Sequence, residues 1–318
     1  MVQTGVLEHT MFVYRDGRKL AETIAPVVRD HLNAGQRVVV NIPGERMTAL
    51  QAALGRAANS IEWTDTYAWR PHPARRLHAI EQLVEVQRAR KGQKVLFVGE
   101  CAWPPSPEVL VREWERFEVI LSATLTGAPA SMLCLYDASV LARSIIERAR
   151  QTHPQHGCGC TIANPRYVDT VTALKSLAPE DLEVPWHATR LTRVREARAA
   201  RAFVANQLVS SNLRHDQRED LIVIASELVA NSLKADADEV SVAVWASDDG
   251  VALQIDDDGQ GISDPFAGYH RPERDATGGR GLWMARQLCD VVEISSRPRH
   301  TAVRALQVPG LFSRASST

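Results

Sequence analysis

Buried-strand and amphipathic-helix patterns alternate along the first half of the chain. Apolar runs without polar alternation are typical of strands covered on both faces, and helical periodicity fills the stretches between them. The predicted strands are His9–Tyr14, Arg37–Ile42, Ser60–Asp65, Lys94–Gly99 and Ser131–Tyr136. The predicted helices are Arg18–Leu32, Glu45–Leu54, Pro73–Arg90, Pro107–Ala123 and Ala138–Thr152. This order predicts an α/β domain with a mainly parallel sheet between two layers of helices.

The second half of the chain follows a different pattern, in which helices are followed by strand pairs. The turn Ser247–Gly250 between two apolar stretches is a hairpin signal. The predicted helices are Val194–Leu208, Asp216–Leu233 and Leu282–Leu288. The predicted strands are Trp186–Thr192, Glu239–Ala246, Val251–Ile255, Val291–Ser296 and Thr301–Val308. We therefore expect an α+β two-layer sandwich over residues 186–310, joined by a linker over 176–185 to a first domain over 5–175.

Length and composition narrow the classes of protein to consider. With 318 residues the chain is long enough for two domains, and its net charge of −1 gives no argument for nucleic acid or a membrane as a direct partner. Its apolar runs are too short to span a bilayer, and its first residues lack a signal-peptide core. Five cysteines without framework spacing fit a reducing compartment. We expect a cytoplasmic protein.

Two acidic motifs in the second half carry candidate chemistry. Glu227 and Asn231 are four residues apart in a helical pattern, so both project from one helix face. A carboxylate there can orient a water or hydroxyl, and the amide oxygen of Asn231 can bind a magnesium ion. Asp257 ends an apolar strand, and the glycines that follow, Gly259 and Gly261, let the backbone approach a ligand closely.

A glycine-rich turn supplies the third motif. The run from Gly278 to Gly281 opens the helix that starts at Leu282, and a helix start offers free backbone amides to phosphate. Each motif alone has a plainer interpretation, because an Asp-rich turn is commonly solvated and Asn231 alone could be a helix cap. The three motifs in this order predict a nucleotide site. The span Ile262–Thr277 is then a lid over the nucleotide or an ordinary long surface loop.

On these motifs, the stretch from about Trp186 to Pro309 resembles the GHKL ATPases, and among them the RsbW-type anti-sigma factors, which are serine/threonine protein kinases. The resemblance implies ATP and magnesium as cofactors, with Glu227 as general base. It implies Asn231 as the magnesium ligand, Asp257 as the acceptor of the adenine amino hydrogen and Thr301 beside the adenine. It places these residues at the nucleotide: Asn231, Lys234, Asp257, Gly259, Gly261, Gly279, Arg280, Gly281, Leu282 and Thr301.

The chain departs from that family at two positions. Ala235 stands where family members usually carry a histidine after the basic residue, and His300 stands where a glycine normally precedes the threonine. The first departure concerns the surroundings of the phosphates, and the second concerns the last hairpin. Nucleotide binding remains the expectation, and the rate of phosphoryl transfer is left open.

The first half of the chain, from about Gly5 to His156, resembles the MEDS domain, the sensory module of DcmR-type regulators. The residues that carry the resemblance are Gly99–Glu100, Trp103–Pro104, Ser106–Pro107, Val111–Glu118, Leu133–Asp137 and Arg148–Pro154. The family's fold is similar to RecA-like ATPase cores. The turn Asn41–Thr48 nevertheless lacks a Gly-Lys-Ser/Thr sequence, so we do not expect it to cradle ATP.

Two groups of residues in the first half are candidates for sensing a small-molecule or redox signal. The aromatic residues Trp103, Trp114, Phe117 and Tyr136 with Glu118 could line a ligand pocket; equally, the aromatics could be core and Glu118 could pair with an arginine. His153, His156, Cys158 and Cys160 could bind zinc, respond to oxidants or lie in a plain mobile loop. Cys134 and Cys289 are interpreted as buried small apolar residues.

Together the two resemblances imply a signal-responsive anti-sigma regulator. Such a protein would hold a sigma factor and phosphorylate a serine or threonine on a STAS-type antagonist, and its kinase family commonly dimerises through the sheet domain. Two alternatives stay open. One is a non-catalytic module in which nucleotide only sets conformation. The other is a sensor histidine kinase, which needs an acceptor histidine on a helical hairpin; His187 lies in a strand-like stretch and His215 in a short loop.

Overall fold

The computed structural model describes residues 8–68, 72–89, 93–101, 103, 108–124, 126–157, 162–272 and 279–309. It divides the chain into two compact units. The N-terminal unit comprises Met1–Pro105 and Trp114–Ala173, and the C-terminal unit comprises Ser106–Glu113 and Leu174–Thr318. Within the described ranges, no helix is long and apolar enough to cross a membrane.

The N-terminal unit is built on a seven-stranded sheet with the order β3-β2-β4-β5-β1-β6-β7. Every neighbouring pair is parallel except the terminal pair of β6 and β7. This confirms the predicted mainly parallel sheet. The strands are β1 (Glu8–Tyr14), β2 (Arg37–Ile42), β3 (Glu62–Asp65), β4 (Val95–Glu100), β5 (Ala130–Asp137), β6 (Gln155–His156) and β7 (Ile162–Ala163).

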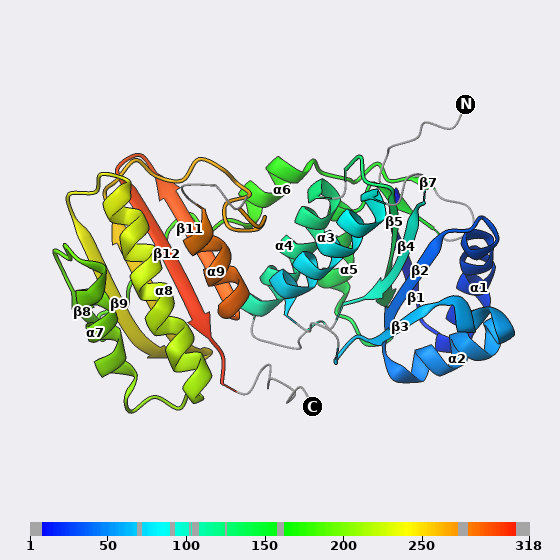
Figure 1. Ribbon diagram of the computed structural model, residues 1–318, viewed down its shortest axis with the longest axis horizontal. Helices are drawn as coiled ribbons and strands as arrows, with labels where there is room; N and C mark the ends of the chain where they lie inside the picture. Colours follow the sequence, from blue (N-terminus) through cyan, green and yellow to red (C-terminus); the bar gives the residue numbers. More distant parts are fainter. Residues whose placement is uncertain are drawn as a thin grey trace. The chain divides into compact units, whose positions relative to one another are not determined.

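Helices cover both faces of this sheet, as Figure 1 shows. The first two helices pack on one face and the next three on the other. They are α1 (Gly17–Asn33), α2 (Gly44–Leu54) with a short 3-10 extension (Gly55–Ser60), α3 (Pro73–Ala89), α4 (Glu108–Thr124) and α5 (Arg143–Thr152). The last begins five residues later than predicted because Asp137 ends β5 in a turn. Its carboxylate accepts a hydrogen bond from the Ser139 amide at 2.8 Å, and its carbonyl accepts one from the Leu141 amide at 2.9 Å.

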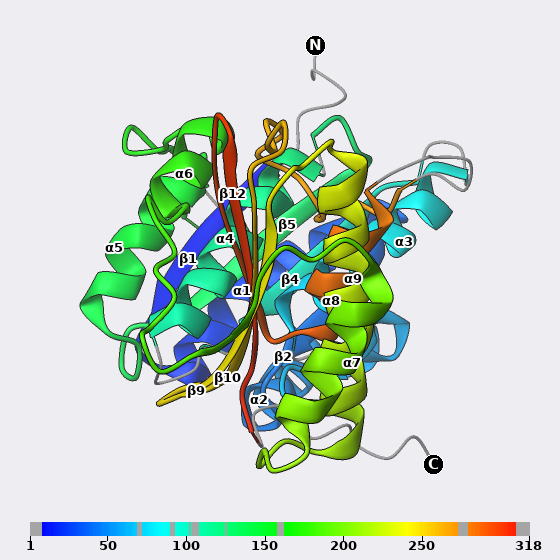
Figure 2. The ribbon, with the colours of Figure 1, turned by 90° about the vertical axis from the view of Figure 1, so that its left-hand side faces the viewer.

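The C-terminal unit is a two-layer α+β sandwich, as predicted. Its five-stranded antiparallel sheet has the order β11-β12-β10-β9-β8. Three helices pack on one face (Figures 1 and 2), and the core between the layers is apolar. The strands are β8 (Thr189–Leu191), β9 (Val240–Ser247), β10 (Gly250–Asp257), β11 (Val291–Arg297) and β12 (His300–Gln307). The helices are α7 (Ala197–Leu208), α8 (His215–Lys234) and α9 (Arg280–Leu288).

The segment before β8 packs on the other face of this sheet. A helix that the sequence did not predict, α6 (Thr170–Leu177), precedes it. Gln254 and Arg304 donate hydrogen bonds to the carbonyls of Leu182 and Glu183, both at 2.8 Å. A turn in which the Ala188 amide bonds the Pro185 carbonyl at 3.1 Å shortens the predicted strand Trp186–Thr192 to β8. Residues 180–184 are therefore tied to the sheet through their backbone.

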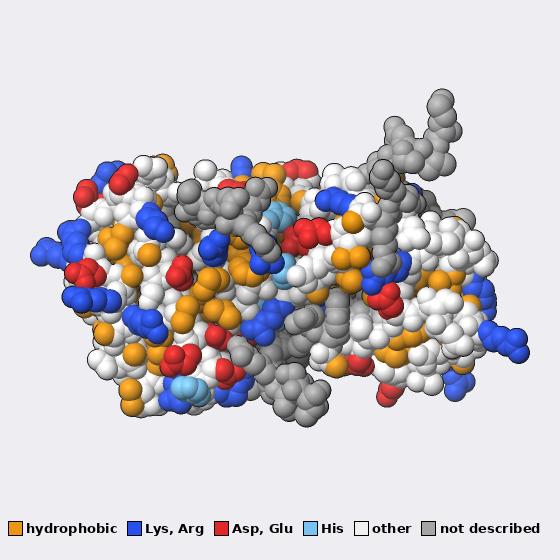
Figure 3. Space-filling view, in the orientation of Figure 1, with side chains coloured by type: hydrophobic (Ala, Val, Ile, Leu, Met, Phe, Trp, Pro, Cys, Tyr) orange, Lys and Arg blue, Asp and Glu red, His pale blue; other side chains and the backbone are white. Residues whose placement is uncertain are grey.

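Charged side chains of both signs are interspersed on the face of the molecule in Figure 3. This distribution agrees with the net charge of −1 for the whole chain. On this face, neither sign gathers into a patch of the kind that attracts a polyanion.

Candidate functional site

The candidate nucleotide site begins on one side of α8. Leu221, Ile224 and Leu228 bury the apolar side of this helix in the core. Glu227 and Asn231 project from a half-buried side, one turn apart. Neither side chain forms a hydrogen bond with another residue in the described part of the chain. Two partly desolvated polar groups are thus held side by side and remain available to a ligand.

The glycine turn at the start of α9 packs directly against these two residues. A Cβ atom at Gly281 would lie 2.7 Å from Nδ2 of Asn231 and 3.3 Å from Cβ of Glu227. The residue that precedes α9, Gly279, has φ of +82°, in the left-handed region that favours glycine. The helix start, with its backbone amides, therefore adjoins the Glu227–Asn231 pair as the motif order predicts. Gly278 lies outside the described residues.

Asp257 lies at the end of β10 and is fixed by two hydrogen bonds. Its Oδ2 accepts one from the Ser232 hydroxyl at 2.6 Å, and its Oδ1 accepts one from the Gly259 amide at 3.0 Å. Ser232 is a buried residue of α8 directly after Asn231. This bond ties the acidic strand end to the same helix that carries Glu227 and Asn231. Sequence reasoning missed Ser232, whose only signal was its position next to Asn231.

Thr301 is the partner of Asp257 across the sheet, in register between β12 and β10. It is 3 % exposed, and its hydroxyl lies 3.3 Å from that of Ser296. Ser296 also accepts a hydrogen bond from the Ile262 amide at 2.8 Å. A Cβ atom at Gly261 would lie 3.0 Å from the Ser296 hydroxyl oxygen, and Gly261 has φ of +86°. Asp257, Gly261 and Thr301 therefore share one wall, and Ser296, which the sequence did not single out, joins them.

Gly259 permits a close approach between the Asp257 turn and the end of α8. A Cβ atom at Gly259 would lie 2.8 Å from the carbonyl oxygen of Ala235, which also accepts a hydrogen bond from the Gln260 amide at 3.3 Å. The backbone of Ala235, one of the two departures from the family pattern, thus supports the turn. Lys234 is exposed at the last position of α8.

The remaining predicted residues lie at the start of α9. Arg280 is exposed at its first position, and Leu282 is half-buried. Leu282 contacts the loop that precedes it in sequence, since a Cβ atom at Gly268 would lie 2.9 Å from the Leu282 backbone. No measured contact joins Lys234, Arg280 or Leu282 directly to Asn231 within the described residues.

The first part of the predicted lid, residues 262–272, folds against α9. The Arg286 guanidinium lies 3.7 Å from the centre of the buried Tyr269 ring, which is stacking range for a cation and an aromatic face. Arg286 also donates hydrogen bonds to the carbonyls of Ala267 at 3.2 Å and Val292 at 3.0 Å. One arginine therefore joins the loop, α9 and β11. Residues 273–277, the rest of the predicted lid, lie outside the described residues.

These residues fit ATP with magnesium. Asn231 would offer an amide oxygen to the cation, and the α9 start would offer backbone amides to phosphate. Two hydrogen-bond donors orient the Asp257 carboxylate, and its oxygens keep further lone pairs that can accept from a ligand. The glycines at 259, 261 and 281 occupy positions where a side chain would collide with the wall of the site.

A separate cleft lies elsewhere in the C-terminal unit. A cleft of about 630 Å³ is bordered by the end of α7 and the β9–β10 hairpin, with His187, Asn212 and Trp245 among its lining residues. It includes none of the motif residues. Among the described residues, the motif residues rather than those of this cleft combine an amide oxygen, a helix start with backbone amides and a carboxylate at a strand end.

The N-terminal unit holds an ion network at the carboxyl ends of its strands. Crossovers from β1 and from its neighbour β5 run to opposite faces, and ligands of open α/β sheets bind at such a switch point. Here Arg46 bonds Glu100 at 2.7 Å and also Asp137, and Tyr14 donates to Glu100 at 2.9 Å. Burial raises the pKa of Glu100 to about 7. Two carboxyl groups occupy this edge of the sheet, and negative charge there does not favour a phosphate.

The aromatic residues singled out for a signal pocket are largely core. Trp114, Phe117 and Tyr136 are buried, and Trp114 and Phe117 meet edge-to-face with ring centres 5.4 Å apart. Among the described residues no arginine forms an ion pair with Glu118, although the buried Arg76 guanidinium interacts with its charge. Glu118 lies between His9 and His153, with Nε2 atoms at 3.5 Å and 3.4 Å from its Oε2. A cavity of about 30 Å³, roughly the size of one water, borders Glu118 and Cys134.

The four residues proposed for zinc or redox sensing do not form a described cluster. His153 is buried after the end of α5, whereas His156 is half-buried in β6. Cys158 and Cys160 lie outside the described residues. Cys134 is buried as expected, but its surroundings are polar, because its thiol contacts His9 and Glu118. Cys289 lies in the apolar core of the C-terminal unit.

Comparison with known protein families agrees with both halves of this description. Residues 8–154 match the model of the MEDS family, the methanogen/methylotroph DcmR sensory domain. Residues 190–306 match the histidine kinase-like ATPase domain. The chain joins a MEDS domain to a histidine kinase-like ATPase domain. Both domain assignments expected from the sequence motifs are thereby confirmed.

A search among solved structures gave a partial match. The RsbU and RsbW domains of Rv1364c from Mycobacterium tuberculosis match with 20% identity and a TM-score of 0.29, over 41% of this chain and 34% of that one. The chain therefore spans about a third of the length of that protein, and a likeness at this level carries no argument about function. A search among curated proteins gave no match.

Proposed function

We propose that the ATPase domain binds ATP with magnesium and transfers the γ-phosphoryl group to a serine or threonine of a STAS-type antagonist. In this proposal the same domain holds a sigma factor, so that phosphorylation of the antagonist keeps the sigma factor sequestered. The MEDS domain supplies the signal that changes this balance. The match to the histidine kinase-like ATPase domain supports the fold and the nucleotide site, and the RsbW-type motifs support the partner class.

The contact between Gly281 and the Glu227–Asn231 pair carries the proposal. Through this contact the start of α9 packs against Asn231, a potential cation ligand, and against Glu227, which carries the carboxylate. Phosphoryl transfer depends mainly on positioning and on neutralising charge, so few residues are needed. Asn231 would hold magnesium, the α9 amides would bind the phosphates, and Glu227 would accept the proton of the attacking hydroxyl.

The wall formed by Asp257 and Thr301 accounts for adenine recognition. The Asp257 carboxylate accepts a hydrogen bond from an exocyclic amino group but would face the keto oxygen of guanine as a second acceptor. A buried acceptor without a donor costs about 1–3 kcal/mol. The Ser232 hydroxyl and Gly259 amide hold the carboxylate in place for this role.

The segment between the two domains favours a serine/threonine kinase over a histidine kinase. Among the described residues from 162 to 196, the only helix is the eight-residue α6, and the rest is extended or turn. His187 lies in an exposed turn, and His215 is the first residue of α8. His187 therefore lies on no helix, and His215 begins a helix of the ATPase domain itself rather than of a separate hairpin before it.

Transfer of labelled phosphate tests the proposal. The full chain is incubated with γ-labelled ATP, magnesium and STAS proteins recovered by affinity capture from native lysate with and without ATP. We expect a labelled STAS protein with the wild type and at least a hundredfold slower labelling with Glu227→Gln. Glu219→Gln is the matched control, since Glu219 is an exposed carboxylate on the same helix. Nucleotide binding without any transfer would instead favour the non-catalytic binding module.

A further inference from the structure

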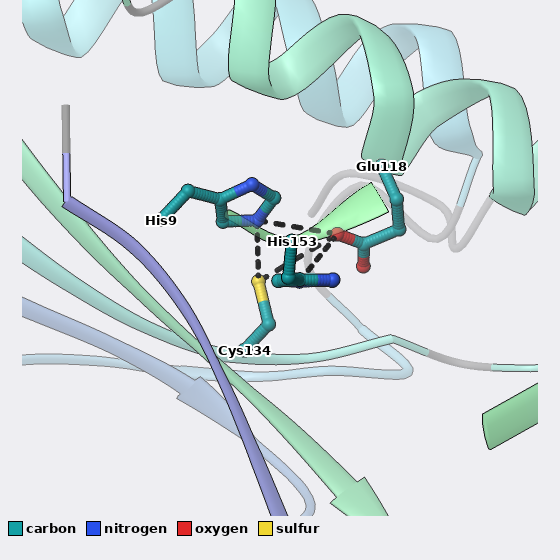
Figure 4. A group of neighbouring side chains, drawn as sticks. All are labelled: His9, Glu118, Cys134 and His153. Carbon is teal, nitrogen blue, oxygen red and sulfur yellow. Dashed lines mark hydrogen bonds and ion pairs between the residues drawn. The ribbon is translucent and has the colours of Figure 1, made fainter. Parts of the chain in front are cut away.

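Four potential metal ligands converge inside the MEDS domain (Figure 4). His9 comes from β1, Glu118 from α4, Cys134 from β5, and His153 follows α5. Strand alternation turns His9 and Cys134 toward the face that α4 and α5 cover. All four side chains are between 0 and 5 % exposed. They come from segments far apart in the sequence, so this polar group is assembled only by the tertiary fold.

Four of the six distances between ligand atoms in this group are close to the edges of a tetrahedral zinc site. Nε2 of His9 lies 3.2 Å from Sγ of Cys134 and 3.5 Å from Oε2 of Glu118. The same Glu118 oxygen lies 3.4 Å from Nε2 of His153 and 3.6 Å from Sγ of Cys134. All ligand atoms lie within 4.8 Å of one another. Zinc bonds of usual length to N, O and S require edges of about 3.3–3.6 Å in a tetrahedron.

The hydrogen bonds of His153 place its proton on Nδ1, so that Nε2, the nitrogen facing Glu118, is unprotonated. Its Nδ1 lies 2.8 Å from the Ala149 carbonyl, which can only accept, so Nδ1 carries the proton. Nε2 then presents a lone pair toward the Glu118 carboxylate and forms no hydrogen bond with any described residue. Two acceptors that face each other in a dry interior are stabilised by a positive charge between them, and a metal ion is one that both atoms can bind.

A hydrogen bond at Nδ1 likewise fixes the orientation of the His9 ring. Its Nδ1 lies 2.6 Å from the Ser122 hydroxyl, and that hydroxyl donates to the Thr152 carbonyl at 3.3 Å. Ser122 therefore accepts from Nδ1, and Nε2 of His9 is free to face Cys134 and Glu118. Metal-binding histidines commonly donate their second ring nitrogen in this manner, which fixes the ring and its tautomer.

Ligand charge and ligand type favour a divalent cation of borderline softness. With both imidazoles neutral, the Glu118 carboxylate and the thiolate form of Cys134 carry two negative charges, and the buried Arg76 guanidinium, which interacts with both, carries one positive charge. A 2+ ion neutralises the two anionic ligands directly. Two imidazoles, a thiolate and a carboxylate suit zinc better than the oxygen-loving magnesium or calcium.

We propose that His9, Glu118, Cys134 and His153 form a zinc site inside the MEDS domain. Four protein ligands close the coordination sphere, which is the arrangement of structural zinc sites. Binding displaces the Cys134 thiol proton to solvent and joins β1, β5, α4 and the end of α5 through one ion. The cavity beside Glu118 and Cys134 leaves room for about one small molecule the size of water next to the ion.

Metal analysis of the full chain tests the site. Protein purified without chelators from zinc-supplemented cells is analysed by mass spectrometry for zinc, iron, nickel, cobalt and copper, and by X-ray absorption at the zinc edge. We expect one zinc per chain, with one sulfur and three nitrogen or oxygen neighbours. The metal-free chain reloaded with cobalt(II) should show tetrahedral d–d bands and a thiolate charge-transfer band.

Matched variants assign the ligands. Cys134→Ser and His153→Gln should lower metal affinity by roughly a hundredfold or more, and Ser122→Ala, which loosens His9, by about 10–100-fold. Cys289→Ser is the control for a buried cysteine, and His156→Gln is the control for a nearby histidine outside the group. Both controls should keep one zinc.

Three results would overturn the proposal. The first is a folded wild-type chain without bound metal that gives no cobalt spectrum. The second is an absorption spectrum without sulfur, which does not depend on any variant being folded. The third is loss of zinc in Cys158→Ser/Cys160→Ser but not in Cys134→Ser, which would move the metal to the 158–160 segment. ATP binding is measured in parallel, because a failure of the zinc proposal leaves the kinase proposal unaffected and the reverse also holds.

Discussion

Gly281 lies against Asn231 so closely that a Cβ atom on it would come within 2.7 Å of the Asn231 amide nitrogen. The start of α9 and the half-buried side of α8 are therefore packed together at the proposed binding point of phosphates and magnesium. The Cβ atom of Glu227 lies at the same place, 3.3 Å from the position of that added Cβ atom. This single packing relationship joins two motifs that are about fifty residues apart in the sequence.

Gly281→Ala should weaken magnesium-dependent ATP binding at least tenfold, or about 1.4 kcal/mol. The new methyl group collides with the Asn231 side chain, which must rotate away from its position in the site. Thermal stability should change little, because alanine is favoured over glycine within a helix. Titration calorimetry with and without magnesium measures the effect.

Gly17→Ala is the control, since Gly17 also lies in a first helical turn and its added Cβ would be 3.9 Å from the nearest atom, Cγ of Arg46. Unchanged affinity in Gly281→Ala would mean that Asn231 does not act from this position.

Asp257→Asn should weaken ATP binding and remove the preference for ATP over GTP. The amide presents a donor as well as an acceptor, so it can no longer discriminate between an amino group and a keto oxygen.

Ser232→Ala should have a smaller effect on ATP binding than Asp257→Asn, of about 1 kcal/mol, because it removes one of the two donors that fix the carboxylate. Dissociation constants for ATP and GTP give both quantities. Asp238→Asn, at an exposed position before β9, should bind both nucleotides as the wild type does.

The MEDS domain should lose stability as pH rises from about 4.5 to about 7, through Glu100. Burial raises the pKa of Glu100 from 4.5 to about 7 in the folded state. Between these values the folded domain binds a proton that the unfolded chain has released, so deprotonation favours unfolding. The loss is about 1–3 kcal/mol and levels off above the folded pKa. Glu100→Gln should flatten this part of the pH profile.

Urea unfolding between about pH 4.5 and pH 8, read by pulsed hydrogen exchange in β4 peptides, measures the Glu100 effect in this domain alone. Glu62→Gln is the control, because the Arg37–Glu62 pair lies on the same sheet but its glutamate is half exposed. An identical pH slope in the wild type and Glu100→Gln would contradict the assignment of the effect to this carboxyl group.

Most elements of the fold could be predicted from the sequence because their apolar periodicity is local. The predicted strand Arg37–Ile42 is β2 with the same bounds. The errors occur where tertiary contacts override the pattern. The predicted strand from Trp186 is cut short by the turn at Pro185, and α5 starts late because of the Asp137 turn. The short strands β6 and β7 have only two residues each, too few for any periodicity.

The candidate site could be predicted only in part, because motifs identify residues but not their supports. Ser232 and Ser296 carry no motif, and their roles depend on the rotation of α8 and on the register of β11 with β12. The histidine–cysteine group shows a sharper limit. The sequence drew attention to His153 through its near neighbours, whereas the structure brings it to His9, more than a hundred positions away.

The measurement that tests the central claim most directly is ATP affinity of the full chain with magnesium and with EDTA, for wild type, Asn231→Ala and Asn206→Ala. Asn206 is an exposed helical asparagine on α7, so its variant controls for the loss of an amide as such. The account predicts that magnesium tightens ATP binding equally in wild type and Asn206→Ala, and that Asn231→Ala loses this tightening. Asn231→Ala that kept the full magnesium-dependent affinity would contradict the nucleotide site.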